Sequence, residues 1–295
     1  MSNWEIAQVM IRLGVYGSTA LVTGGLLGAW SCRTQVVELS YIYRLTVWGG
    51  IAGAIFSVAG FLFSVGQFSD AGVIGMFDAE MMTLVWDSDI RLQSQWRVGG
   101  FLLLTLAGSL LIKQQVPTHQ ARLIVGAVVS VGLFALLYSY TQTGHTADKD
   151  ILATVSLMAH VAFVTWWVGC VVALIQVCDR HHPALIKALM NGFGRTATLF
   201  VPVIVLYGIA LMVQIIPSWS TFSESYGLTL LTKLGVFVLV MLLAARHRFL
   251  LVPQLTDKQS VNHLKQSIIL ELVLLITIFI LTAVLSSTMG AHGTS

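Results

Sequence analysis

Charged residues are scarce in this chain. Asp, Glu, Lys and Arg make up 10% of its 295 residues, whereas they make up about 25% of an average soluble domain. Hydrophobic residues reach 56%, and the mean hydropathy is +0.84. A soluble core could not bury this much apolar surface. The composition therefore excludes an ordinary soluble domain and indicates that lipid surrounds much of the chain.

Several other features are few or missing. The three cysteines, Cys32, Cys170 and Cys178, are too few and too far apart for a disulfide framework. The sequence contains no nucleotide-binding fingerprint, no nucleophile elbow and no paired carboxylates, so it lacks the motifs of hydrolases and ATP-driven pumps. We therefore expect no enzymatic activity. No nucleic-acid partner is expected either.

Long apolar stretches recur along the chain, and about 20 apolar residues suffice for a helix to cross the hydrocarbon of a membrane. The first stretch follows no basic segment and is too long for the core of a signal peptide, so we expect a retained helix. Eight windows fit: 6–30, 45–67, 97–115, 121–141, 149–177, 196–216, 228–251 and 268–290. The sequence predicts an all-α, polytopic membrane helix bundle of about eight transmembrane helices, a single domain over residues 1–295.

Lysine and arginine are divided unequally between the two sets of connections. The connections after the first, third, fifth and seventh windows hold Arg33, Arg44, Lys113, Arg122, Arg180, Lys187, Arg195, Arg246, Arg248, Lys258 and Lys265, and the other set holds Arg91, Arg97 and Lys149. Cytoplasmic loops are rich in these residues. Both termini are therefore expected outside, in the periplasm, and the protein is expected in the cytoplasmic (inner) membrane.

The longest connection, 68–96, mixes acidic and apolar residues and is predicted to be a short amphipathic segment on the outer membrane surface. The soft-ligand side chains of this segment and of the C-terminal tail are Met76, Met81, Met82, Met289 and His292. Thioether and imidazole groups suit Cu(I), so these residues are secondary candidates for metal ligands. The alternative is that the methionines only pack or face lipid.

Four ionisable residues lie inside the predicted spans: Arg12, His160, Lys233 and Glu271. Such groups are costly in lipid and usually face a bundle interior or a wet cavity. By residue count, Arg12 and Lys233 lie near the outer surface. Glu271 lies about one turn inside the cytoplasmic surface, too far from Lys233 to pair with it. For Arg12, Lys233 and Glu271, both snorkelling or local pairing and a place on a transport path remain open.

His160 belongs to the stretch LMAHVAFVTWWVGC (157–170) and lies about 16 Å below the surface, near the middle of the bilayer. Ser156, Val164 and Trp167 share its face at helical spacing. A neutral imidazole binds metal without carrying charge itself. We expect His160 to be an inner metal ligand, with Trp167 as a hydrophobic constriction below it. The alternative is a core histidine that is hydrogen-bonded to a neighbouring helix.

A second histidine, His145, lies in the polar stretch TQTGHTADKD (141–150), where Gly144 ends the fourth predicted helix. The C-terminal end of a helix carries partial negative charge and therefore favours a bound cation nearby. Because the next helix carries His160, the two histidines together predict a path from outside, with His145 as the outer metal ligand.

Four stretches stand in the order TGHT (143–146), HVAFVTWWVG (160–169), SYGLTLLTKLGVFVLVMLLAARHRFLLVP (225–253) and ILELVLLITIFILTAVL (269–285). Together they resemble motifs of the copper-resistance D (CopD) family of inner-membrane proteins. Arg12 falls where the family often has an arginine, whereas His247 stands where the family commonly has asparagine. The resemblance implies copper handling at the cytoplasmic membrane, import rather than efflux, and often a periplasmic CopC-like copper-binding partner.

We therefore expect a membrane protein that binds and transports copper ion, with Cu(I) favoured, and contributes to copper resistance. Its expected partners are copper, membrane lipid and a CopC-like protein. One alternative is a haem-carrying electron-transfer bundle. No second histidine is expected inside a span, so Met212 would have to supply the second axial ligand. Another alternative is a non-transporting partner of a periplasmic copper chaperone, docked through 68–96.

Overall fold

The computed structural model describes residues 3–32, 40–69, 71–113, 118–143, 151–215 and 225–288. This part of the chain contains helices and no strand. The elements are α1 (Asn3–Cys32), α2 (Ser40–Ser69), η1 (Gly72–Phe77), α3 (Ala79–Trp86), α4 (Asp89–Ile112), α5 (His119–Tyr138), η2 (Ser139–Thr141), α6 (Ile151–Arg180), α7 (Pro183–Ile215), α8 (Ser225–Arg246), η4 (His247–Leu251) and α9 (Lys258–Thr288). Eight of these helices are long and apolar enough to cross a membrane. The expected all-α, polytopic fold is confirmed.

The helix bounds differ from the expected windows mainly at two places. α7 begins at Pro183 rather than near 196, and α9 begins at Lys258 rather than near 268. The first turns of both helices contain polar residues, and the apolar windows did not include them. An apolar window marks only the part of a helix that lies in lipid. Glu271 therefore lies more than three turns inside α9, not one turn inside its end.

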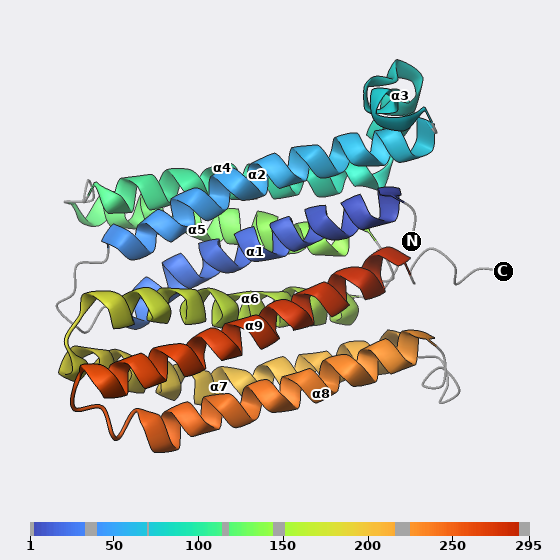
Figure 1. Ribbon diagram of the computed structural model, residues 1–295. Helices are drawn as coiled ribbons and strands as arrows, with labels where there is room; N and C mark the ends of the chain where they lie inside the picture. The colour runs from blue at the N-terminus through green and yellow to red at the C-terminus, as the bar shows by residue number, and fades with distance from the viewer. Residues whose placement is uncertain are drawn as a thin grey trace.

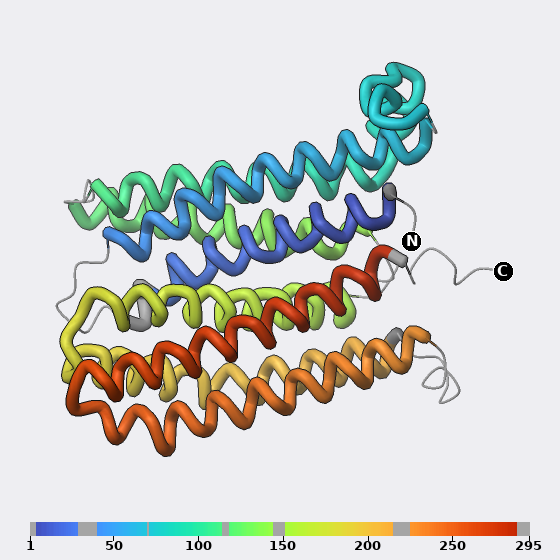
Figure 2. Tube along the Cα trace, viewed as in Figure 1, coloured from blue at the N-terminus to red at the C-terminus, as the bar shows by residue number. Residues whose placement is uncertain are grey.

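The long helices run alternately up and down, so α1 begins and α9 ends at the same end of the bundle, which we call the termini end (Figure 1). The tube view shows the same alternation (Figure 2). We call the opposite end the far end. α1 lies centrally and contacts α2, α6 and α9. The central position of α1 and α6 places Arg12 and His160 in the interior of the bundle.

Glycine permits an unusually close approach of α1 and α6. A Cβ on Gly169 would lie 1.8 Å from the carbonyl oxygen of Ala20, and a Cβ on Gly24 would lie 2.2 Å from the carbonyl carbon of Gly169. Small residues let helix backbones touch in this way inside membranes, where burial of apolar surface gives little drive to associate. The contact holds α6, with His160 and Trp167, against α1.

The predicted segment 68–96 is helical and lies at the termini end (Figure 1). α2 ends at Ser69, η1 and α3 follow, and Asp78 caps α3 by accepting hydrogen bonds from the backbone N–H groups of Glu80 and Met81. Three apolar side chains of η1, Val73, Ile74 and Phe77, are at least 70% exposed. Its contact with a membrane surface stays a prediction.

Candidate functional site

A cavity of about 640 Å³ lies inside the bundle between α1, α2, α4, α6, α7, α8 and α9. It brings together four of the residues singled out in the sequence, namely Arg12, His160, Trp167 and Lys233. Arg97 and Met212 line it as well. Glu271 is not among the lining residues. The cavity is therefore the place in the described chain where the proposed path residues meet.

His160 presents one ring nitrogen to α7, and the other has no partner among the described residues. Its Nδ1 lies 3.1 Å from the carbonyl oxygen of Ile204. Because a carbonyl only accepts, Nδ1 carries the proton, and Nε2 of the neutral ring keeps its lone pair. No hydrogen bond to Nε2 is found in the described ranges. Metal-bound histidines commonly donate their other ring N–H to a carbonyl in this way.

Gly208 gives His160 room beside α7. A Cβ on Gly208 would lie 3.2 Å from Cε1 of His160, which is a tighter contact than most real Cβ atoms make. The ring is thus held between a carbonyl of α7 and a glycine one turn further on, while it still borders the cavity.

The expected stripe around His160 is only partly correct. Val164 and Trp167 line the cavity with it, but Ser156 does not. Ser156 is fully buried, and its hydroxyl has no hydrogen-bond partner among the described residues. At 100° per residue, Ser156 and Val164 lie on opposite sides of His160 around the helix axis. A stripe this wide faces more than one neighbouring helix, so its two edges have different surroundings.

Three cations line the cavity: Arg12, Arg97 and Lys233. Arg97 donates from Nε to Ser139 Oγ at 3.2 Å, and its guanidinium carbon lies 4.9 Å from the centre of the Tyr140 ring. Arg12 and Lys233 have no hydrogen bond or ion pair with any residue that the structure describes. Among the described residues that line the cavity there is no carboxylate. Arg97 was counted from the sequence as a loop residue, because α4 begins eight residues earlier than its window, at Asp89.

A separate, fully paired network lies between α6, α8 and α9. Nε1 of Trp167 donates to Oε1 of Glu271 at 3.0 Å, and Oε2 of Glu271 lies 3.1 Å from Nδ1 of His247. Ser267 Oγ lies 2.7 Å from Nε2 of His247, to which it donates when the ring is neutral, and it accepts from Arg246 at 3.4 Å. With Glu271 ionised and His247 neutral, every donor in this chain meets an acceptor.

The network bears on one alternative that the sequence left open, for Glu271, and it corrects one expectation, about histidines. Glu271 and His247 are only 3% and 4% exposed, so Glu271 neither snorkels nor opens to the cavity; it pairs locally. His247 also contradicts the expectation that no second histidine lies inside a span, because it is buried within the span Ser225–Leu251. Its position in the window 228–251 could have revealed it. The π-helical turn that starts at His247 turns its ring toward α9.

The other soft-ligand candidates lie away from the cavity or outside the described residues. Met76 is buried, and a Cβ on Gly66 of α2 would lie 2.9 Å from its Cγ, so it packs between η1 and α2. Met81 and Met82 are half-buried on α3. His145, Met289 and His292 lie outside the described residues. In the part of the chain that is described, no three His, Cys, Asp or Glu residues cluster in a way that could hold a metal ion.

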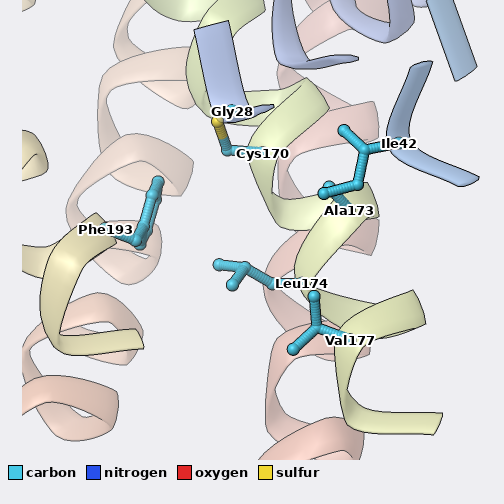
Figure 3. Close-up of a pocket in the computed structure, with 7 residues that line it drawn as sticks. All are labelled: Gly28, Ile42, Cys170, Ala173, Leu174, Val177 and Phe193. Atoms are coloured by element: carbon cyan, nitrogen blue, oxygen red, sulfur yellow. The ribbon is translucent and has the colours of Figure 1, made fainter. Parts of the chain in front are cut away.

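A second, much smaller cavity of about 20 Å³ lies beside Cys170 (Figure 3). Its lining is Gly28, Ile42, Cys170, Ala173, Leu174, Val177 and Phe193. This is room for about one water molecule, but the lining offers almost no polar atoms, and such cavities stay dry.

Residues 187–285 match the model of a protein family described as CopD, copper resistance protein D. The match covers most of α7, all of α8 and most of α9, which includes Lys233, His247 and Glu271. Arg12 and His160 lie outside it. No curated protein and no solved structure matches the chain. The resemblance seen in the sequence is confirmed over α7 to α9.

Proposed function

We propose that this CopD-family, multi-pass membrane protein binds copper in its central cavity and transports it across the cytoplasmic membrane, in the direction of import. The observation that supports the proposal is the hydrogen bonding of His160. Its Nδ1–H donates to the carbonyl of Ile204, and the lone pair on Nε2 is therefore available to a metal ion in the cavity. A neutral imidazole with one N–H fixed by a carbonyl is the form in which histidine binds metal.

The proposed path uses side chains of the sort that Cu(I) prefers. His145 would take copper at the termini end, and His160 would hold it inside the bundle. Met212 lines the same cavity, one helical turn from Gly208, and offers a thioether as a second ligand. Trp167 forms part of the wall beyond His160. Copper is the transported substrate here, and a periplasmic CopC-like protein that docks on segment 68–96 would supply it.

The test is copper binding to the purified His160→Leu variant in detergent. The variant loses one hydrogen bond, so we expect its unfolding free energy to fall by only about 1 kcal/mol, while bound copper per chain is lost. His263→Leu removes an exposed imidazole of α9 outside the cavity and should bind copper as the unaltered protein does. A His160→Leu variant that still binds copper normally contradicts the ligand role.

Transport itself is tested by copper uptake into proteoliposomes that contain the protein alone, in a fixed orientation. Single cysteines at positions 256 and 295 of a cysteine-free variant report that orientation. With both termini outside, an impermeant thiol reagent added to whole cells reaches position 295 and not 256. The opposite labelling would reverse the sides proposed for His145 and segment 68–96.

A haem-carrying electron-transfer bundle is the second candidate, and the composition of the cavity favours it. His160 and Met212 border a largely apolar space of about 640 Å³ that also carries cations able to pair with propionate groups. The absorption spectrum separates the two functions. A Soret band in the purified protein that disappears in His160→Leu supports haem, whereas a colourless protein that binds copper supports transport.

A further inference from the structure

We infer that the cavity is a binding site for an amphipathic anion, whose phosphate or carboxylate head group lies between Arg12 and Arg97 and whose apolar body fills the cavity. The inference does not rest on copper binding, since it concerns side chains other than His160.

The first observation is a pair of like charges that has no counter-charge among the residues that the structure describes. Arg12 and Arg97 both line the cavity, and the charge of Arg12 acts on Arg97, whereas no carboxylate of the described residues lines the cavity. Arg12 makes no hydrogen bond or ion pair within the described ranges. Two adjacent cations inside a bundle are costly in a medium of low dielectric constant, and such residues are normally paired. An oxyanion between them would supply the missing charge.

The second observation is that Arg97 is held in place before any ligand arrives. Ser139, which is fully buried, accepts from Nε of Arg97. The Tyr140 ring lies under the guanidinium, and its hydroxyl is 2.8 Å from Oγ1 of Thr19. The ring of Tyr16 stacks on Tyr140 at 6.0 Å. The Nη groups of Arg97 remain for a ligand, and guanidinium groups bind carboxylate and phosphate through two parallel hydrogen bonds.

The third observation is the size and lining of the space. A bare phosphate or carboxylate would occupy a small part of about 640 Å³, which is instead in the range of cavities that take small organic molecules. Apolar side chains from α1, α2 and α9 line it, among them Ile11, Phe56, Phe63 and Phe279. The ligand must therefore join a charged head group to an apolar body.

The experiment measures binding of decyl phosphate to the full-length protein in a neutral detergent, by thermal unfolding and by equilibrium dialysis. Decanol and inorganic phosphate are the comparison probes, because each carries half of the proposed ligand. The variants are Arg12→Gln and Arg97→Gln. Lys233→Met is the matched control, because it also removes one cation from the cavity. Lys233 lies on α8, and its charge acts on the ring of His160. Arg122→Gln removes an exposed cation of α5 outside the cavity.

We expect decyl phosphate to bind saturably and to raise the unfolding temperature, and neither comparison probe to do so at the same concentration. Each arginine variant should weaken binding by about tenfold or more, as expected for the loss of a charge-assisted hydrogen bond. Lys233→Met should change it by less, and Arg122→Gln should not change it. The ligand-free Arg12→Gln protein should unfold at a higher temperature than the unaltered protein, because an unpaired charge is gone, and saturating decyl phosphate should reverse that order.

Equal binding by Arg12→Gln and the unaltered protein overturns the inference, as does binding of decanol with the affinity of decyl phosphate. Inorganic phosphate that binds as well as decyl phosphate overturns the amphipathic part. Copper binding by Arg12→Gln is measured in parallel, so that failure here is distinct from failure of the copper proposal. The source of the ligand is read from the purified protein: equimolar anionic phospholipid in native mass spectra identifies a lipid, and a Soret band identifies haem.

Discussion

Ionisable side chains lie inside the bundle at two places, the network and the cavity, and the two places differ in whether these side chains have protein partners. In the network of Trp167, Glu271 and His247, each polar side-chain atom has a protein partner and the residues are at most 4% exposed. In the cavity, Arg12 and Lys233 have no partner among the described residues, and Nε2 of His160 has none either.

We interpret this difference as one between ionisable groups that stabilise the fold and ionisable groups that are available to a ligand. A buried hydrogen-bond network whose polar atoms are all paired holds α6, α8 and α9 together and leaves nothing for another molecule. The cations that border the space of about 640 Å³ have no counter-charge among the described residues, and these are the groups that we propose bind a molecule from outside the chain. Substitutions should therefore damage stability in the network and binding in the cavity.

The largest expected effect on stability is that of Glu271→Leu. It leaves the Nδ1–H of His247 and the Nε1–H of Trp167 without their buried acceptor, so the unfolding free energy should fall by about 3 kcal/mol. The measurement is unfolding in mixed micelles. Asp179→Asn is the matched control, because it breaks the exposed pair with Lys265 between the same helices, α6 and α9, and exposed pairs contribute under about 1 kcal/mol. Equal losses in the two variants would remove the distinction between a dry network and surface charge.

His247→Asn should cost less, about 1.5 kcal/mol. The shorter amide can satisfy Glu271 or Ser267 but does not span both, so one of two buried hydrogen bonds is lost. The variant also introduces the residue that the CopD resemblance leads one to expect at this position. Combining it with Ser267→Ala in a double-mutant cycle should give a coupling energy of about 1 kcal/mol. Additive effects would show that His247 and Ser267 do not act as one unit.

Tyr140→Phe tests the cavity side of the comparison. The ring stays under Arg97, and only the hydroxyl that pairs with Thr19 is lost, so the unfolding free energy should fall by about 1 kcal/mol. Tyr138→Phe is the control, since its ring packs on Phe134 and its hydroxyl makes no hydrogen bond within the described part of the chain. If Tyr140→Phe lowers the unfolding free energy as much as Glu271→Leu does, then hydrogen bonds in the cavity wall stabilise the fold as strongly as those of the network. That result would contradict the difference proposed between the two places.

The smallest effect is expected at an exposed carboxylate, Asp257, at the start of α9. Its Oδ1 accepts from the backbone N–H of Ser260 at 2.8 Å, and hydrogen bonds from Ser260 lower the pKa of Asp257 below its ordinary value of 3.8. Its stabilising contribution is therefore present above pH 3.8 and is lost as pH falls through the lowered pKa. Asp257→Ala should lower the unfolding temperature slightly at pH 7 and not at all near pH 2. A deficit that persists in acid would show that the carboxylate is not the cause.

The sequence predicted the number and type of the helices because a chain in lipid has few choices: every backbone N–H and C=O must be paired inside its own segment. It also identified Arg12, His160, Lys233 and Glu271 as out of place in lipid. It did not predict that Arg97 lies inside α4 and lines the cavity. Arg97 was counted with a connection because a window that scores hydropathy begins only where the helix becomes apolar.

What the sequence by itself determined is that the chain has eight helices long and apolar enough to cross a membrane and that Arg12, His160, Lys233 and Glu271 lie within them. Only the tertiary structure decided which of those residues are paired. Glu271 meets Trp167, which is 104 residues away, and His247 on a third helix. Arg12 and Lys233, equally costly in lipid, meet no counter-charge in the described ranges. Spacing along one helix sets the face on which a charge lies, whereas its partner depends on which other helices pack against that face and at what depth.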